Sequence, residues 1–251
     1  MPTTVFLLIV LISAFSVPAV ADPLFDPPPL TDEENRLNAL HRYMLRERRY
    51  AELDKHMNQI QQDYEQGKRS DVELLHLFRA FYDTDPNLER NFSDWIVAYP
   101  QSYAAREAEG IYFRRVGYGA RGSDYISKTP PQQIARMRAY LDRSLASHKA
   151  ALNFTAKPLL TYYDLLSLSK LLGDRALAEH TLRSACRIDP RNFIVRYKYM
   201  LMLETRWGGS LQEMVSFRED SKHAGLTNEQ LGYLDELIVT ERAWLAKRRS
   251  R

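Results

Sequence analysis

The spacing of its apolar residues constrains this sequence most, because beyond the first thirty residues it follows the period of the α-helix and almost never alternates. One segment shows the pattern clearly, with apolar residues three or four positions apart at Tyr50, Leu53, Met57, Ile60 and Tyr64. Residues with this spacing lie along one face of a helix. The same spacing recurs to the end of the chain and predicts an all-α fold.

Capping boxes mark where these helices begin. In a capping box a hydroxyl accepts a hydrogen bond from the third amide of the helix, and an acid or amide side chain reaches back. The sequence contains five: Thr31–Glu34, Ser70–Glu73, Thr129–Gln132, Ser210–Glu213 and Thr227–Gln230. Pro130 follows Thr129 at the favoured first helical position.

Together the caps and the periodicity predict eleven helices. We expect them near residues 31–47, 49–66, 71–83, 87–98, 102–117, 130–152, 159–172, 175–187, 193–206, 211–223 and 228–247. The one long irregular stretch is expected from Gly117 to Thr129.

The helices also show signs of repetition. The positions 12, 8 and 5 residues before Pro100 and before Pro190 are apolar or small: Leu88, Phe92 and Trp95, and Ala178, Leu182 and Ala185. This spacing is similar to the second helix of a tetratricopeptide repeat. No helix pair can bury its apolar stripe alone, so stacked pairs complete the core. We therefore predict a tetratricopeptide-like solenoid of helical hairpins over residues 31–251, with an irregular helical bundle as the alternative.

The N-terminus has the character of a signal peptide. Residues 1–21 carry no charged side chain, and residues 5–17 form one apolar run of 13 residues. As a helix this run would be roughly 20 Å long, shorter than the roughly 30 Å core of a membrane. Ala19-Val20-Ala21 then supplies the small-x-small pattern of a cleavage site. We expect cleavage between Ala21 and Asp22, a proline-rich extended leader over 22–30, and a periplasmic or secreted protein of a Gram-negative bacterium. A retained N-terminal anchor is the alternative.

Composition argues against several classes of function. The 35 basic and 32 acidic side chains nearly balance, which does not suggest a nucleic-acid partner. The single cysteine, Cys186, excludes an intramolecular disulfide and a multi-cysteine metal cage. The six histidines are scattered without a His-Glu-x-x-His motif, so we expect surface or half-buried helix residues and no metal site.

One motif resembles a nucleotide-binding loop. Residues 117–122 match Gly-x-Gly-x-x-Gly, but that motif binds pyrophosphate only between a strand and a helix. Here a helix precedes it, so we interpret the glycines as ending that helix in left-handed conformations. We therefore expect no cofactor.

Two regions carry a resemblance to a known family. The first contains Pro100-Gln101-Ser102-Tyr103-Ala104-Ala105, then Gly110-Ile111-Tyr112 and Ala120-Arg121-Gly122; the second contains Arg206-Trp207-Gly208-Gly209-Ser210, then Met214 and Phe217. Together they resemble the bacterial exported family called domain of unknown function 4034, over roughly residues 50–220. The sequence departs from the family pattern at Thr205, where proline is expected, and at Thr-Pro-Pro (129–131), where an aromatic residue is expected. The resemblance implies a helical fold and export, and no established reaction.

The Arg206-Trp207-Gly208-Gly209-Ser210 segment is expected between two helices. Gly208 or Gly209 closes one helix in the left-handed conformation, and Ser210 opens the next. We expect Trp207 to pack between repeats, with Arg206 over its ring or on an acid.

What remains for function is a surface. Stacked helical hairpins form a concave face lined by their first helices, and such faces bind peptides or proteins. Projecting the repeat pattern onto the chain gives six expected exposed groove positions: Glu107, Arg114, Arg115, Tyr163, Lys170 and Tyr197. Tyrosine and arginine are enriched in binding hot spots.

We therefore expect an exported, non-catalytic protein that binds a protein or peptide of the cell envelope, with no membrane span after cleavage. One alternative is an immunity protein that neutralises a secreted antibacterial toxin. A second is a cell-envelope glycan-acting enzyme, although no pair of carboxylates stands out.

Overall fold

The computed structural model of the chain describes residues 30–122 and 128–249. Over these ranges it is all-α, with eleven α-helices and no strand. The helices are α1 (Asp32–Arg46), α2 (Tyr50–Glu65), α3 (Asp71–Phe78), α4 (Leu88–Ala98), α5 (Tyr103–Arg121), α6 (Pro131–Ala151), α7 (Leu159–Leu172), α8 (Arg175–Ile188), α9 (Phe193–Met200), α10 (Leu211–His223) and α11 (Asn228–Arg249). Two short 3₁₀ helices, η1 (Arg79–Phe81) and η3 (Thr205–Trp207), follow α3 and α9. The predicted signal peptide lies outside the described residues.

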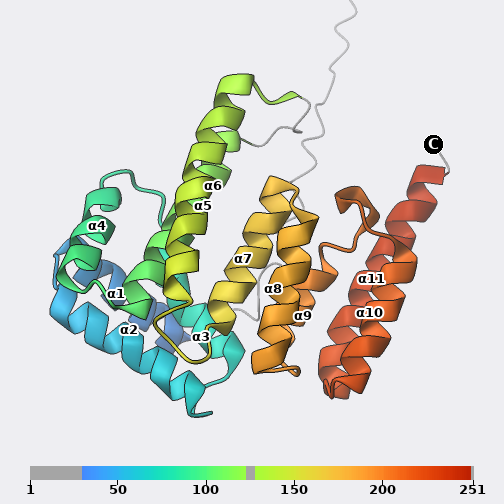
Figure 1. Cartoon of the computed structure of the whole chain (residues 1–251), viewed down its shortest axis with the longest axis horizontal. Coiled ribbons are helices and arrows are strands. Elements are labelled where there is room, and N and C mark those ends of the chain that lie inside the picture. Colours follow the sequence, from blue (N-terminus) through green and yellow to red (C-terminus); the bar gives the residue numbers. More distant parts are fainter. Residues whose placement is uncertain (1–29, 123–127, 250–251) are drawn as a thin grey trace, which may run out of the picture.

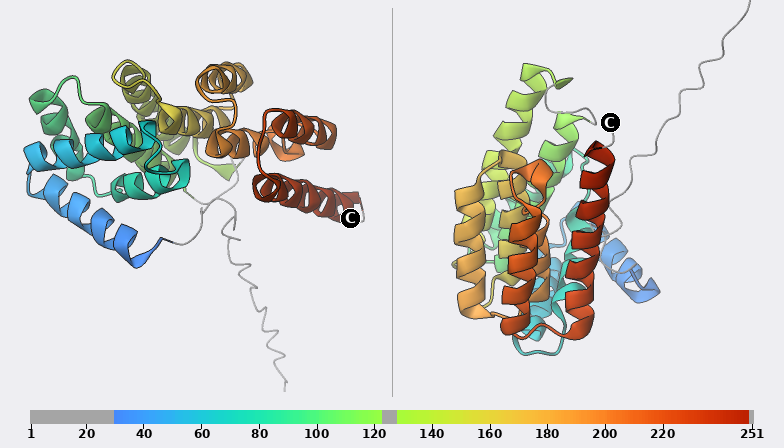
Figure 2. Two further views of the ribbon diagram at one scale, coloured as in Figure 1. Left: turned by 90° about the horizontal axis from the view of Figure 1, so that it is seen from below. Right: turned by 90° about the vertical axis from the view of Figure 1, so that its right-hand side faces the viewer.

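The helices are arranged in a row that follows the order of the chain. Figure 1 shows α1, α2 and α4 at one end, α5 to α9 in the middle, and α10 and α11 at the other end. Neighbours in sequence pack as hairpins, above all α5 with α6, α7 with α8, and α10 with α11. In Figure 2, α1 and α11 lie on the same side of this row. The arrangement is consistent with a helical solenoid.

The hydrophobic core lies between the helices and runs along the whole row. One cluster of buried apolar side chains extends from α1 to α11, and a smaller one joins α6 to α7. In the first half of the chain aromatic rings carry the packing, with 5.8 Å between the ring centroids of Phe81 and Trp95 and 4.8 Å between those of Phe92 and Tyr112. Each hairpin therefore completes its core against the next one.

Most of the predicted helix starts are confirmed. Thr31 and Ser70 form reciprocal capping boxes with Glu34 and Glu73, and Thr227 exchanges the same pair of hydrogen bonds with Gln230. Ser210 caps α10 by accepting a hydrogen bond from the Glu213 amide.

The predicted cap at Thr129 is wrong. The residue before α6 is Pro130, which is extended (φ −56°, ψ 142°), and the first helical residue is Pro131. A residue that precedes proline is disfavoured in the helical region, because its backbone would collide with the proline ring. Pro131 therefore prevents Pro130 from joining the helix and delays its start.

The end of α5 also differs from the prediction. The helix continues through Gly117 and Gly119 to Arg121, and only Gly122 takes a positive φ of 77°. At Gly117 a β-carbon would lie 3.1 Å from side-chain atoms of Leu141 and Tyr140 on α6. Gly117 therefore lets α5 approach α6 closely, and it does not form the turn that the sequence predicted. Conversely, the helix predicted over 193–206 ends at Met200 and is followed by turns and η3.

No helix within residues 30–122 and 128–249 combines the length and apolarity needed to cross a membrane.

Candidate functional site

A strip of basic and aromatic side chains comes from four elements, η1, α5, α7 and α9, in the middle of the molecule. We call it the basic strip; it comprises Arg79 in η1, Tyr82 after η1, Arg114 and Arg115 in α5, Tyr163 in α7 and Lys198 in α9. The three guanidinium carbons lie 5.8, 5.8 and 4.9 Å from the centroid of the Tyr82 ring, in the order Arg79, Arg114, Arg115. The Lys198 ammonium lies 4.8 Å from the centroid of the Tyr163 ring. All four cations are thus held by cation–π contacts.

One acid of the described chain is paired within this strip. Asp164 forms an ion pair with Arg114, with 2.6 Å between Asp164 Oδ1 and Arg114 Nη2. The Asp164 side chain is 1% exposed. Arg115 has no such partner among the ion pairs of the described residues, and burial together with the charge of Arg114 lowers its pKa. Arg115 is therefore a cation of the basic strip without an acid partner, whereas Lys198 is buried, at 3% exposure.

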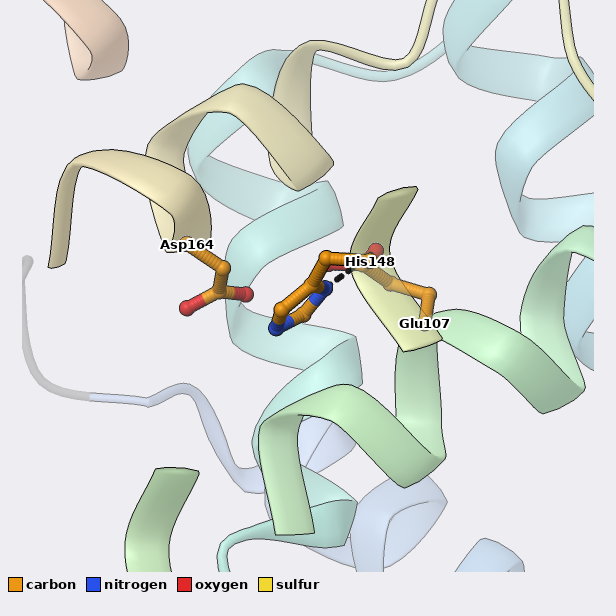
Figure 3. A group of neighbouring side chains, drawn as sticks. All are labelled: Glu107, His148 and Asp164. Atoms are coloured by element: carbon orange, nitrogen blue, oxygen red, sulfur yellow. Dashed lines mark hydrogen bonds and ion pairs between the residues drawn. The ribbon is translucent and has the colours of Figure 1, made fainter. Parts of the chain in front are cut away.

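A buried charge network lies beneath the strip. It comprises Glu107 on α5, His148 on α6, Asp164 on α7 and Arg114. Figure 3 shows the His148 ring between the two carboxylates, with Nδ1 directed at Glu107. His148 Nδ1 lies 3.0 Å from Glu107 Oε2, which also accepts a 2.8 Å hydrogen bond from the Thr161 hydroxyl. The network thus joins three helices, and its Glu107, His148 and Asp164 side chains are at most 1% exposed.

The carboxylates decide the protonation of His148. Burial by itself lowers the pKa of the imidazole and raises that of the Glu107 carboxyl. At His148 the charges of Glu107 and then Asp164 outweigh burial, so the pKa of His148 is raised above its ordinary value. With His148 protonated, two negative and two positive side chains balance, which is the condition under which buried charges are tolerated.

The same three side chains also meet the distance requirement for a metal ion. Glu107, His148 and Asp164 each offer one donor atom, and these atoms lie within 4.8 Å of one another. A divalent cation would displace the His148 proton and add charge to a group in which Arg114 already faces Asp164. The donor set therefore fits a proton and a guanidinium better than a metal ion.

A glycine makes room for this network. The His148 ring packs on Gly110 of α5, where a β-carbon would lie 2.5 Å from the ring carbon Cε1. Ser144, one turn earlier on α6, donates a 2.6 Å hydrogen bond to the Gly110 carbonyl. Gly110 therefore sets how closely α6 approaches α5 at the network.

The six predicted groove residues divide into three groups. Arg114 and Arg115 are half-buried in the basic strip, and Tyr197 is half-buried near Tyr163. Lys170 lies apart from the strip, with its ammonium 4.6 Å from the centroid of the Trp207 ring. The prediction that Glu107 and Tyr163 are exposed is wrong, since they are 0% and 7% exposed. Glu107 is covered because α5 packs against both α6 and α7.

Two expectations about single residues also need correction. Trp207 does not pack between repeats but is 45% exposed, and its indole nitrogen donates to Glu204. Arg206 pairs with an acid, as predicted: its guanidinium donates two hydrogen bonds to the carboxylate of the same Glu204. Gly208 takes the predicted left-handed conformation, with φ 87°.

The expectation that the histidines are all at or near the surface is wrong as well. His41, His76 and His148 are buried, at 3% exposure or less. Burial lowers the pKa of His41 to about 4, with smaller contributions from His56 and Arg42. His148 behaves in the opposite way because it lies between carboxylates. The positions of the histidines in the sequence do not indicate that burial lowers the pKa of His41 while carboxylates raise the pKa of His148.

The fold and the site define an all-α protein of packed helical hairpins fastened by buried charges. A family profile, the domain of unknown function 4034, matches residues 38–178, which is more than half of the 251-residue chain. The chain belongs to this family, which confirms the resemblance for the first of the two regions; the second, at 206–217, lies outside the matched residues. The matched range contains the whole buried charge network and all of the basic strip except Lys198. No curated protein and no solved structure matches the chain.

The raised pKa of His148 predicts a pH-dependent stability. A group whose pKa is raised by folding stabilises the fold fully below its unfolded pKa of about 6.5, and that contribution is lost as pH rises through the folded value. The free energy of unfolding, measured by urea denaturation, should therefore fall more steeply above about pH 6.5 for the wild type than for His148→Gln. His180→Gln, at an exposed position, should keep the wild-type slope. Identical slopes for all three proteins would contradict the assignment of a proton to His148.

The packing at Gly110 gives a second prediction. Gly110→Ala places a methyl group against His148 and should lower the free energy of unfolding by about 1–3 kcal/mol, the usual cost of overpacking. Gly119→Ala, in the same helix with nothing within 4 Å of its added β-carbon, should raise it by up to about 1 kcal/mol. The free energy of unfolding of both variants is measured by denaturant titration. If the Gly110→Ala protein were as stable as the Gly119→Ala protein, the packing of His148 on Gly110 would not be tight.

Proposed function

We propose that this chain is an exported, non-catalytic, tetratricopeptide-like protein that binds an acidic protein or peptide segment of the cell envelope through the basic strip. The observation that supports the proposal is the half-buried Arg115 guanidinium, which lies over the Tyr82 ring and has no acid partner among the ion pairs of the described residues. A guanidinium that is already held in place binds an acidic segment with little loss of side-chain entropy.

The position of the strip in the fold supports docking. Its residues come from η1, α5, α7 and α9, and α5 and α7 are the first helices of successive hairpins. First helices line the binding face of solenoids built from helical pairs. The strip also consists of arginine, tyrosine and lysine, and the first two are the residue types that dominate binding hot spots.

The non-catalytic part of the proposal is supported by the burial of the chemically richest group. Glu107, His148 and Asp164 contain the residue types of an acid–base site, but each is at most 1% exposed. A general acid or base must come within hydrogen-bond reach of its substrate. Their partners are one another, Arg114 and Thr161, which suits a structural role.

Export is tested by the mature N-terminus. Expressed in a Gram-negative host, the protein should appear in the periplasmic fraction with a mass that lacks residues 1–21. Ala21→Arg, which removes the small residue that signal peptidase requires, should accumulate uncleaved. Full-length wild-type protein in the membrane fraction would favour the retained anchor instead.

Partner binding is tested on the basic strip. Affinity purification from periplasmic extract with the wild type supplies the partner, and Arg115→Glu should then weaken its capture about tenfold, or about 1.4 kcal/mol. Arg114 is unsuitable for this test because its loss would leave Asp164 buried and unpaired. The matched control is Arg138→Glu on the exposed side of α6, which should bind normally.

Two further measurements make the result clear. Arg115→Gln removes the charge without adding a carboxylate and should give an intermediate loss, while the wild-type affinity should fall with rising salt. Equal capture by Arg115→Glu and Arg138→Glu, at unchanged melting temperatures, would refute the basic strip as the docking site.

A further inference from the structure

The C-terminal end of α11 carries an apolar stripe that continues past the hydrophobic core. Leu234, Ile238 and Glu241 are buried along one face of the helix, and the same three-to-four spacing leads on to Trp244 and Leu245. These last two side chains are only half-buried, and neither packs on the two core clusters of the described residues. They therefore still have apolar area to bury against a partner.

The lengths of the paired helices explain why this part of the stripe is left open. α11 has 22 residues, whereas α10, its hairpin partner, has 13, so the last turns of α11 extend beyond α10. There the loop that contains η3 is bonded to α11 at Glu241, which accepts hydrogen bonds from the Thr205 amide and hydroxyl. Figure 1 shows the end of α11, marked C, at the outer edge of the row.

The same end of the helix is strongly basic. From Arg242 to Arg251 the sequence contains five basic residues and no acidic one, and the Lys247 and Arg248 side chains are exposed. The Arg248 guanidinium carbon lies 4.7 Å from the centroid of the Trp244 ring, which places positive charge directly beside the apolar stripe. This end of α11 therefore combines cations with apolar surface and would attract an anionic partner.

The loop beside this end exposes a second indole. Trp207 is 45% exposed, and its nitrogen donates to Glu204, whose carboxylate is also held by Arg206. Figure 1 shows this loop, between α9 and α10, at the same edge of the molecule as the end of α11, in agreement with the contact of Thr205 with Glu241. The edge therefore presents tryptophan from two elements that are bonded to each other.

We propose that this edge of the molecule binds the surface of an anionic phospholipid bilayer. Trp244 and Leu245 enter the interfacial region, where tryptophan is enriched because its ring is apolar and its nitrogen polar. Lys247 and Arg248 bind the lipid phosphates. A helix with basic residues beside tryptophan and leucine has the composition that binds bilayer interfaces. The contact is peripheral and independent of the basic strip.

The test is co-sedimentation of the processed protein, residues 22–251, with two kinds of vesicle: phosphatidylcholine alone, and phosphatidylcholine mixed with phosphatidylglycerol in equal parts. We expect binding to the mixed vesicles that weakens with rising salt, and about tenfold weaker binding to phosphatidylcholine alone. Equal binding to both, or binding to neither, would overturn the proposal. Capture of an acidic protein by this edge without vesicle binding would also overturn it, in favour of a protein partner.

Matched charge variants place the contact at the end of α11. Lys247→Gln combined with Arg248→Gln should weaken binding to the mixed vesicles about thirtyfold, at about fivefold for each charge. The control combines Arg36→Gln with Lys55→Gln, which removes two exposed charges from α1 and α2 at the other end of the row, and it should bind as the wild type does. Equal affinities of the two double variants would refute the site.

A second pair of variants tests the apolar part of the contact. Trp244→Ser removes the ring but no charge, and it should weaken binding to the mixed vesicles about tenfold. Val239→Ser is the control, because Val239 is 61% exposed and lies on the opposite face of α11 from the stripe; it should bind normally. Equal binding by the two variants, at unchanged melting temperatures, would show that the stripe does not enter the bilayer.

Discussion

The ion pairs buried between α5, α6 and α7 are the interaction on which the middle of this molecule depends. Glu107 and His148 are fully buried, and Asp164 with Arg114 lies next to them. Removing one member of such a set leaves an uncompensated charge and costs about 3–5 kcal/mol, whereas the intact set is close to neutral. A packing of the three helices that separated these members would carry that cost.

Arg114 connects this interior to the surface. Its guanidinium pairs with Asp164 below and lies over the Tyr82 ring above. The position of the basic strip thus follows from the position of the buried charges, and Arg115 is carried by the same turn of α5. A near-neutral composition gives no sign of this arrangement, in which one guanidinium of α5 is paired in the interior and its neighbour is not.

The helix map could be read from the sequence because its signals are local. Caps such as Ser70 with Glu73 and the three-to-four spacing of apolar residues act within one or two turns. The errors arose where a neighbour in sequence or space intervened. Pro131 displaced the start of α6, and contact with α6 kept Gly117 helical. Projection of a repeat pattern placed Glu107 at the surface, because a pattern from one helix pair contains no information about a third helix that covers the same side chain.

The sequence by itself determined the class of fold, the helices and the family, since short-range hydrogen bonding and amphipathic spacing set all of these. Only the tertiary structure decided which charged residues are buried and which form a surface. Glu107, His148 and Asp164 are 16 to 57 positions apart along the chain, and nothing in their local sequences distinguishes them from exposed helical residues. Their pairing is a consequence of how closely α6 approaches α5 over Gly110, and burial then sets their charge states.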